Sequence, residues 1–239
     1  MSRAVLVPEL RKLASGRTGR QVVVLPPAGG GFLPYLGLAA ALVEHGDVHA
    51  VRARGLAAGE DPDTDVPAMV TRCLAAISGL SSVPAVLAGW SLGGVLAWHV
   101  AAHLAAHEGH RPAVVLLDSF VRLPPDSDLA AFTQSIVDGW PAALPEADRN
   151  RLRRTATAHV RAAAGHEVTV PYAGPALLLA CGDGPVRRQR AEWERLSSQL
   201  RTEVVDGDHF GLLVSKRLPA VAGHVGGFLQ DVLGKEGNP

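Results

Sequence analysis

The sequence is poor in several features that would mark particular classes of protein. It has only two cysteines, Cys73 and Cys181, both within apolar stretches, so we expect two buried thiols rather than a disulfide. No apolar run approaches the roughly 20 residues that a membrane-spanning helix needs. The 23 basic and 23 acidic residues cancel, which argues against a nucleic acid or an anionic membrane as a partner. The first residues lack the apolar core of a signal peptide, so we expect a soluble, cytoplasmic protein.

What the sequence does contain is an alternation of short apolar runs with longer amphipathic stretches. This pattern is typical of an α/β protein with a mainly parallel sheet flanked by helices. We expect strands at Gln21–Leu25, Val48–Arg52, Ala85–Ala88, Ala113–Leu117, Ala176–Cys181 and Thr202–Val205. We expect helices at Pro34–Glu44, Val66–Ile77, Leu92–His107, Arg187–Gln199 and Pro219–Leu233. Because there is neither an internal repeat nor a low-complexity linker, we predict a single domain over residues 1–239.

The segment from about 121 to 172 interrupts this alternation. It separates two expected core strands and reads as helices at Asp128–Val137 and Glu146–Ala163. A simple crossover between parallel strands needs far less chain. We therefore predict an inserted helical lid over the carboxyl edge of the sheet, where open α/β folds bind their ligands.

The stretch Gly89–Gly93 reads G-W-S-L-G and lies between an expected strand and an expected helix. In this setting G-x-S-x-G predicts a strained strand-to-helix turn that exposes the serine hydroxyl as a nucleophile. The amino end of the following helix adds free N–H groups and partial positive charge at the same point. Ser91 is therefore the candidate nucleophile.

A serine nucleophile needs a base, and the base needs an acid to orient it. His209 is the candidate base because it lies in a loop between the last expected strand and the C-terminal helix, as the chain order Ser…Asp…His requires. His224 is the only later histidine, and its apolar helix favours a packing role. For the acid, Asp118 and Asp183 both follow expected strands, and the local pattern leaves both open, with a slight preference for Asp183.

An oxyanion hole completes this kind of site. The stretch Pro26–Gly31 follows an expected strand, and its small residues leave backbone N–H groups free to point into the site. We assign the backbone N–H groups of Ala28 and Leu92 to the oxyanion hole. A phosphate-binding loop is the alternative for the glycine run, but the Gly-Lys-Ser/Thr sequence that it requires is absent.

Four motifs in this order give the chain a resemblance to a known family. They are VLPPAGGG (Val24–Gly31), AGWSLGG (Ala88–Gly94), VVLLDSF (Val114–Phe120) and GDHFGLL (Gly207–Leu213). Together they resemble the thioesterase domains of nonribosomal peptide and polyketide synthases, which belong to the α/β-hydrolase superfamily. The resemblance covers essentially the whole chain.

The resemblance implies that the acid stands where Asp118 is, with Asp183 as the alternative. It implies an acyl or peptidyl carrier protein as partner, whose phosphopantetheine thioester loads the chain onto Ser91, and release by hydrolysis or macrocyclisation. Neither a bound cofactor nor a metal is expected. Stand-alone editing thioesterases also resemble this chain, and they commonly carry the acid at the later loop, where Asp183 is. A non-catalytic carrier-binding module is the alternative from a different class.

Further residues carry weaker signals. Phe132 and Trp140, in the expected lid, are candidates to line an acyl pocket or to close the core of the lid. Its arginines, Arg149, Arg151, Arg153, Arg154 and Arg161, either dock an acidic carrier protein or form a solvated face. His99, His103 and His107 share a helix face, and without an H-E-x-x-H pattern we expect a solvated or partly packed face rather than a metal site.

Overall fold

The computed structural model describes residues 9–234, and its centre is a seven-stranded sheet. The strands are β1 (Leu10–Ala14), β2 (Gln21–Leu25), β3 (Asp47–Val51), β4 (Val86–Trp90), β5 (Ala113–Leu117), β6 (Ala176–Cys181) and β7 (Leu200–Val205). They lie in the order β1-β3-β2-β4-β5-β6-β7, and all neighbouring pairs are parallel except β1 with β3. The predicted mainly parallel sheet is confirmed.

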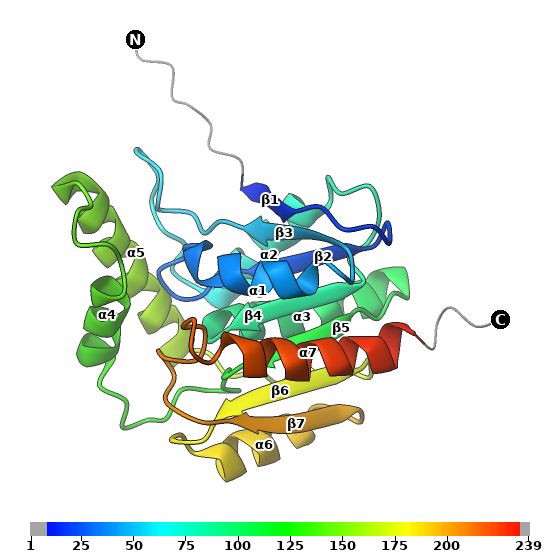
Figure 1. Ribbon diagram of the computed structural model, residues 1–239. Helices are drawn as coiled ribbons and strands as arrows, with labels where there is room; N and C mark the ends of the chain where they lie inside the picture. The colour runs from blue at the N-terminus through cyan, green and yellow to red at the C-terminus, as the bar shows by residue number, and fades with distance from the viewer. Residues whose placement is uncertain (1–8, 235–239) are drawn as a thin grey trace.

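Helices connect the strands and cover both faces of the sheet. They are η1 (Leu33–Tyr35), α1 (Leu36–Leu42), α2 (Val66–Ile77), α3 (Leu92–Glu108), α4 (Leu129–Asp138), α5 (Glu146–Ala164), α6 (Val186–Glu194) and α7 (Leu218–Leu233). Figure 1 shows α1 and α7 on the near face, where they contact each other, while α2 and α3 contact each other on the far face. The result is a sheet between two helical layers.

The structure differs from the sequence-based expectation at some elements. β1 was not predicted, because it is an antiparallel edge strand that carries Arg11 and Lys12 and lacks an apolar run. β4 continues to Trp90 rather than ending at Ala88, so the strand runs directly into the turn at Ser91. α6 ends at Glu194 instead of Gln199, because β7 already begins at Leu200.

The continuous apolar runs of the strands fill two cores at once. In β2, Val22 and Val24 belong to the core beneath α1 and α7, whereas Val23 and Leu25 belong to the core that includes α3. This division follows from the alternation of side chains along a strand. The run therefore predicts a strand that is covered on both faces, as the structure shows.

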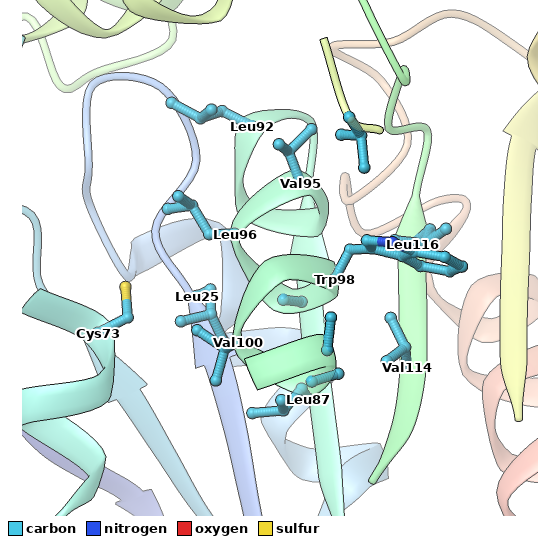
Figure 2. Close-up of a cluster of buried hydrophobic side chains, with 14 of the residues drawn as sticks. Leu25, Cys73, Leu87, Leu92, Val95, Leu96, Trp98, Val100, Val114 and Leu116 are labelled. Atoms are coloured by element: carbon cyan, nitrogen blue, oxygen red, sulfur yellow. The ribbon is translucent and has the colours of Figure 1, made fainter. Parts of the chain in front are cut away.

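Helix α3 is held firmly against the sheet by its apolar side chains. Figure 2 shows Leu96 and Val100 of α3 beside Leu25 and Leu87 of the sheet, and all four side chains are fully or almost fully buried. Burial of each such side chain contributes roughly 1.5–3 kcal/mol to stability. The amino end of α3, directly after Ser91, is therefore fixed in place.

The predicted insertion lies between β5 and β6 and contains α4 and α5, which pack against each other. Figure 1 shows this pair at one end of the sheet, beside the loop that leads into α7. The insertion begins where β5 ends, so it starts at the carboxyl edge of the parallel strands. The ring of Phe132 in α4 lies 5.4 Å from the ring of His209, between centroids.

The two cysteines are free and buried, Cys73 in α2 and Cys181 at the end of β6, as expected. Burial raises the pKa of the Cys73 thiol to about 12, so it remains protonated. Within residues 9–234, no helix combines the length and the apolar character that crossing a membrane requires.

Candidate active site

The turn between β4 and α3 consists of Ser91 alone. Its backbone has φ 58° and ψ −123°, a conformation that is rare and strained for a residue with a side chain. The Ser91 N–H donates to the carbonyl of Leu117 at 2.9 Å, and the Ser91 carbonyl accepts from the Gly94 N–H at 3.1 Å. The turn is therefore tied to β5 on one side and to α3 on the other.

The glycines around Ser91 are required by close packing. A Cβ on Gly89 would lie 2.0 Å from the carbonyl carbon of Gly93, and one on Gly93 would lie 2.5 Å from the carbonyl oxygen of Leu25. A Cβ on Gly94 would lie 2.0 Å from Ser119 Oγ. No side chain fits at these three positions without movement of the turn, which gives the physical reason for the glycine pattern of the motif.

His209 and Asp118 are joined although 91 residues of sequence separate them: His209 Nδ1 lies 2.7 Å from Asp118 Oδ2. The two side chains are 16% and 4% exposed. An ionised carboxylate only accepts hydrogen bonds, so Nδ1 donates and Nε2 keeps its lone pair. A histidine in this state can accept a proton from a neighbouring alcohol.

The second oxygen of Asp118 is held as well. Oδ1 accepts from the backbone N–H of Cys181 at 3.0 Å and from the side-chain amide of Gln189 at 3.2 Å. Burial raises the pKa of Asp118, but the hydrogen bonds from His209, Cys181 and Gln189 together outweigh it and hold the pKa below its usual value. The carboxyl group is therefore ionised at neutral pH.

The structure does not bring Asp183 into the same relationship. Asp183 is exposed, its backbone N–H donates to the carbonyl of Gly207 at 3.2 Å, and none of the hydrogen bonds found within residues 9–234 joins its carboxylate to His209. It does line the cavity that contains Ser91. His224, the later histidine, is partly exposed, and its Nδ1 lies 3.7 Å from Glu203 Oε2.

Three aromatic rings surround His209. The centroids of Trp90, Phe132 and Phe210 lie 5.2, 5.4 and 5.1 Å from the centroid of the imidazole. Phe132 and His209 also line a cavity of about 250 Å³, together with Ser91 and Asp118. The nucleophile, base and acid candidates therefore share one cavity.

A second cavity, of about 340 Å³, adjoins the same aromatic cluster. Trp90 and Phe210 line it, as does Trp140, whose ring packs against the backbone of Gly31. Among the described residues that line this cavity, none is charged. Phe132 and Trp140, the two candidate pocket residues, thus belong to different cavities.

The two residues assigned to an oxyanion hole meet at Ser91. Ala28, Ser91 and Leu92 all line a small cavity of about 20 Å³, which is close to the space that one water molecule needs. The loop that carries Ala28 continues through Gly29 and Gly30 with φ of 81° and 70°. The Gly30 N–H donates to the carbonyl of Pro27 at 2.8 Å, so the chain turns sharply directly after Ala28.

Tyr35 supports the site, although no pattern in the sequence indicated this. This side chain is 1% exposed, and its hydroxyl donates to the carbonyl of Leu25 at 2.7 Å while accepting from the backbone N–H of Trp90 at 2.8 Å. It thus connects the strand before the Ala28 loop to the strand before Ser91. Neither the spacing nor the composition around Tyr35 signals a contact 55 residues away.

The histidines of α3 do not form a metal site. His99 Nε2 lies 2.9 Å from His166 Nε2, while the rings of His103 and His107 stack with centroids 4.1 Å apart. In the described part of the chain, no group of three or more His, Cys, Asp or Glu side chains is arranged to hold a metal ion.

Three of the five arginines of the insertion contact other groups of the protein. Arg149 donates to the carbonyl of Ala142, and Arg154 donates to the carbonyl of Glu60 at 2.8 Å. Arg151 contacts Asp148. These contacts fit a solvated face that braces the insertion, and the docking role remains a prediction.

Comparison with known proteins shows the family to which this fold belongs. The Thioesterase domain family model matches residues 20–229. The Vlm2 thioesterase domain, solved with a dodecadepsipeptide bound, is 25% identical and superimposes with a TM-score of 0.76 over 91% of this chain and 96% of its own. The NocB thioesterase domain, solved in covalent complex with a fluorophosphonate nocardicin G analogue, is 25% identical with a TM-score of 0.72, over 90% and 96% of the two chains.

A larger protein shows the same fold in another context. In holo-AB3403, a four-domain nonribosomal peptide synthetase, 20% of that chain superimposes on 91% of this one with a TM-score of 0.76, at 19% identity. No curated protein sequence matches this chain significantly. The family match over residues 20–229, together with the α/β-hydrolase architecture shared with these structures, establishes that this chain belongs to the thioesterase domain family, as the resemblance predicted.

Proposed function

We propose that this chain is a serine thioesterase that releases an acyl or peptidyl chain from the phosphopantetheine thioester of a carrier protein. The observation that carries the proposal is the 2.7 Å hydrogen bond between His209 and Asp118, on a cavity that Ser91 also lines. The strained conformation of Ser91 supports the same function, because strain of this kind is retained where the surrounding structure needs it.

In the first half of the reaction, Ser91 Oγ attacks the thioester carbonyl. His209 Nε2 takes the hydroxyl proton, the Oγ–C bond forms, and the tetrahedral oxyanion receives hydrogen bonds from the backbone N–H groups of Ala28 and Leu92. Such donors lower the barrier by roughly 3–4 kcal/mol. The C–S bond then breaks, and the imidazolium gives its proton to the departing thiolate of the carrier's arm.

In the second half, the acyl-serine is released. A water molecule, or a hydroxyl or amine of the acyl chain itself, attacks the ester carbonyl while His209 accepts its proton and then returns it to Ser91 Oγ. The product is an acid in the first case and a ring in the second. Since the reaction transfers an acyl group without any redox change, we propose that no cofactor is needed beyond the arm of the substrate.

We propose that the carrier's arm approaches through the cavity of about 340 Å³, which α4 of the lid and the residues directly after it help to enclose. Pantetheine is uncharged, and so are the residues that line this cavity. Leu33 and Val214, which line it, are 46% and 45% exposed, which is unusual for large apolar side chains. Lys216, two residues after Val214, is exposed as well. This surface, Leu33, Val214 and Lys216, fits an acidic carrier.

The solved relatives support the reaction class. Vlm2 holds a depsipeptide through an engineered 2,3-diaminopropionic acid, and NocB forms a covalent complex with a fluorophosphonate. The hydrogen bond between Asp118 and His209 supports a synthase-terminal enzyme over the editing class, for which Asp183 was the expected acid. A carrier-binding module without catalysis has no use for the hydrogen-bonded pair beside Ser91.

The proposal is tested with one acyl chain presented in three forms: on a holo-carrier protein, on free pantetheine as a thioester, and as an oxygen ester. We expect turnover of both thioesters, with a lower KM for the carrier-bound form, and the mass of the product reports water attack or ring closure. Binding of the acyl-carrier without turnover of any form would establish the binding module instead.

The approach surface is tested separately with variants that introduce a negative charge. Leu33→Glu and Val214→Glu should raise KM for the acyl-carrier at least tenfold and leave turnover of the pantetheine thioester within about twofold. Val83→Glu and Val204→Glu are matched controls, because these side chains are 39% and 49% exposed and line none of the cavities at the site. Equal effects of all four variants would contradict this surface.

A further inference from the structure

Gln189 in α6 has a buried side chain whose amide is only half satisfied. It is 1% exposed, and its Nε2 donates to Asp118 Oδ1 at 3.2 Å and to the carbonyl of Ser119 at 2.9 Å. Its Oε1 has no hydrogen-bond partner among the residues that the structure describes. The amide cannot be reversed, because Oε1 would then face two acceptors.

This arrangement is costly for a residue with a packing role alone. A buried carbonyl without a donor destabilises the folded state, whereas a methionine of similar length would fill the same space without that cost. The one polar contact with a chemical consequence is the one that Nε2 makes with Asp118. Gln189 is therefore placed to act on Asp118, the candidate acid of the site.

Two donors on Oδ1 decide how the Asp118 carboxylate is turned. The Cys181 N–H and Gln189 Nε2 both bind Oδ1, which leaves Oδ2 for His209 Nδ1. With the Cys181 bond alone, the carboxylate could rotate about its Cβ–Cγ bond and still satisfy that donor. Gln189 removes this freedom.

The backbone beside Asp118 is fixed from the same helix. Asp118 has φ 44°, one of two positive values for non-glycine residues in the described chain. The next carbonyl, that of Ser119, accepts from Gln189 Nε2 and from Trp193 Nε1 at 2.8 Å. Helix α6 therefore holds both the carboxylate and the strained turn that carries it.

We infer that Gln189 is a positioning residue, which holds Asp118 so that Oδ2 faces His209. It touches neither the substrate cavities nor the reacting atoms, and it acts only through the carboxylate. The inference rests on the proposed function for its effect on rate. Its effect on the Asp118–His209 hydrogen bond does not depend on which substrate the protein uses.

The first test follows the hydrogen bond itself, without substrate. Because the His209 Nδ1 proton is shared with a carboxylate, we expect it to give a far-downfield signal in the proton NMR spectrum of the wild-type protein. We expect Gln189→Met to shift this signal upfield and to broaden it by exchange with water. An unchanged signal in a folded Gln189→Met protein would overturn the inference.

The second test is kinetic and uses the acyl-pantetheine thioester. Gln189→Met should lower kcat about three- to tenfold, the worth of one hydrogen bond, with KM unchanged. The acidic limb of the pH–rate profile should move to lower pH, because a carboxylate that is no longer held toward Nδ1 stabilises the imidazolium less. A rise in KM with kcat unchanged would overturn the positioning role, and absence of wild-type turnover would contradict the proposed function while the NMR test still stands.

Gln21→Met is the matched control. Gln21 is also buried, at 4% exposure, and its amide donates to Ser81 Oγ at 3.2 Å, at the end of β2 away from the site. In this variant the NMR signal, kcat and pH profile should stay as in wild type. If Gln21→Met changed them equally, the effect would be one of general stability and the inference would be wrong.

Discussion

The Tyr35 hydroxyl lies 2.8 Å from the backbone nitrogen of Trp90 and 2.7 Å from the carbonyl oxygen of Leu25. Burial raises the pKa of Tyr35, so the hydroxyl stays neutral and can donate to one group while it accepts from the other. Leu25 precedes the loop with Ala28, and Trp90 precedes Ser91. One hydroxyl therefore sets the separation between the candidate nucleophile and the candidate oxyanion loop.

Tyr35→Phe should leave two buried backbone groups without a partner, at a cost of about 1–3 kcal/mol in the free energy of unfolding. We expect kcat to fall about tenfold as well, because the two loops are no longer connected. Urea unfolding and thioester turnover measure these effects. Tyr172→Phe is the control: this buried hydroxyl donates to the carbonyl of Pro112, away from the site, so stability should fall without a matching loss of kcat.

Substitution of the two candidate acids should separate them clearly. Asp118→Asn leaves the shape of the site intact but favours the wrong tautomer of His209, so kcat should fall by a factor on the order of 10³–10⁴. Asp183→Asn should change kcat by less than about threefold, since the exposed carboxylate makes no hydrogen bond to His209 in the described chain. A larger loss from Asp183→Asn than from Asp118→Asn would assign the acid to the later loop.

Glycine substitutions test how tightly the turn at Ser91 is packed. In Gly94→Ala, the new methyl group would overlap Ser119 Oγ, so we expect a loss of about 2 kcal/mol or more in stability and a large loss of activity. Gly223→Ala in α7 meets nothing within 4 Å and removes a flexible residue from a helix. It should stabilise the protein by up to about 1 kcal/mol with full activity, as thermal unfolding and turnover would show.

We predict that the buried His159 makes the folded protein less stable in mild acid. Burial lowers its pKa to about 4, from an ordinary value near 6.5, although the nearby Asp63 opposes part of this shift. Below pH 6.5 His159 binds a proton in the unfolded chain but not in the folded chain. The free energy of unfolding therefore falls from pH 6.5 to pH 4 and then levels off. The full change is about 3 kcal/mol.

The test is urea unfolding of wild type and His159→Leu at several pH values. The variant should show a shallower decline between pH 6.5 and 4, although not a flat one, because burial also lowers the pKa of His99 to about 4. Parallel declines in the two proteins would mean that His159 is not a source of the acid sensitivity.

The sequence was sufficient for those parts of the fold and the site that rest on local patterns. Continuous apolar runs predicted every strand buried on both faces, and only the edge strand β1, with Arg11 and Lys12, escaped. The turn at Ser91 could be predicted because its glycines and its serine are adjacent in the chain. The start of β7, a partly exposed strand, and the end of α6 were predicted less accurately, because no local stop signal in the sequence marks either boundary.

The parts that depend on distant packing could not be predicted. Tyr35 and Gln189 meet their partners 55 and 71 residues away, and a tyrosine or glutamine in a helix carries no sign of such a contact. The choice between Asp118 and Asp183 was open for the same reason. Both follow parallel strands, and only the folded position of the His209 loop brings one of them within 2.7 Å of the imidazole.

The central claim is that Ser91 carries the acyl chain. The most direct measurement is the intact mass of wild type and Ser91→Ala after brief incubation with an acyl-pantetheine thioester, followed by mapping of any adduct to a peptide. We expect wild type to gain the mass of the acyl group on the peptide that contains Ser91, and folded Ser91→Ala to gain none. An equal adduct on Ser91→Ala, or neither adduct nor product with wild type, would contradict the account.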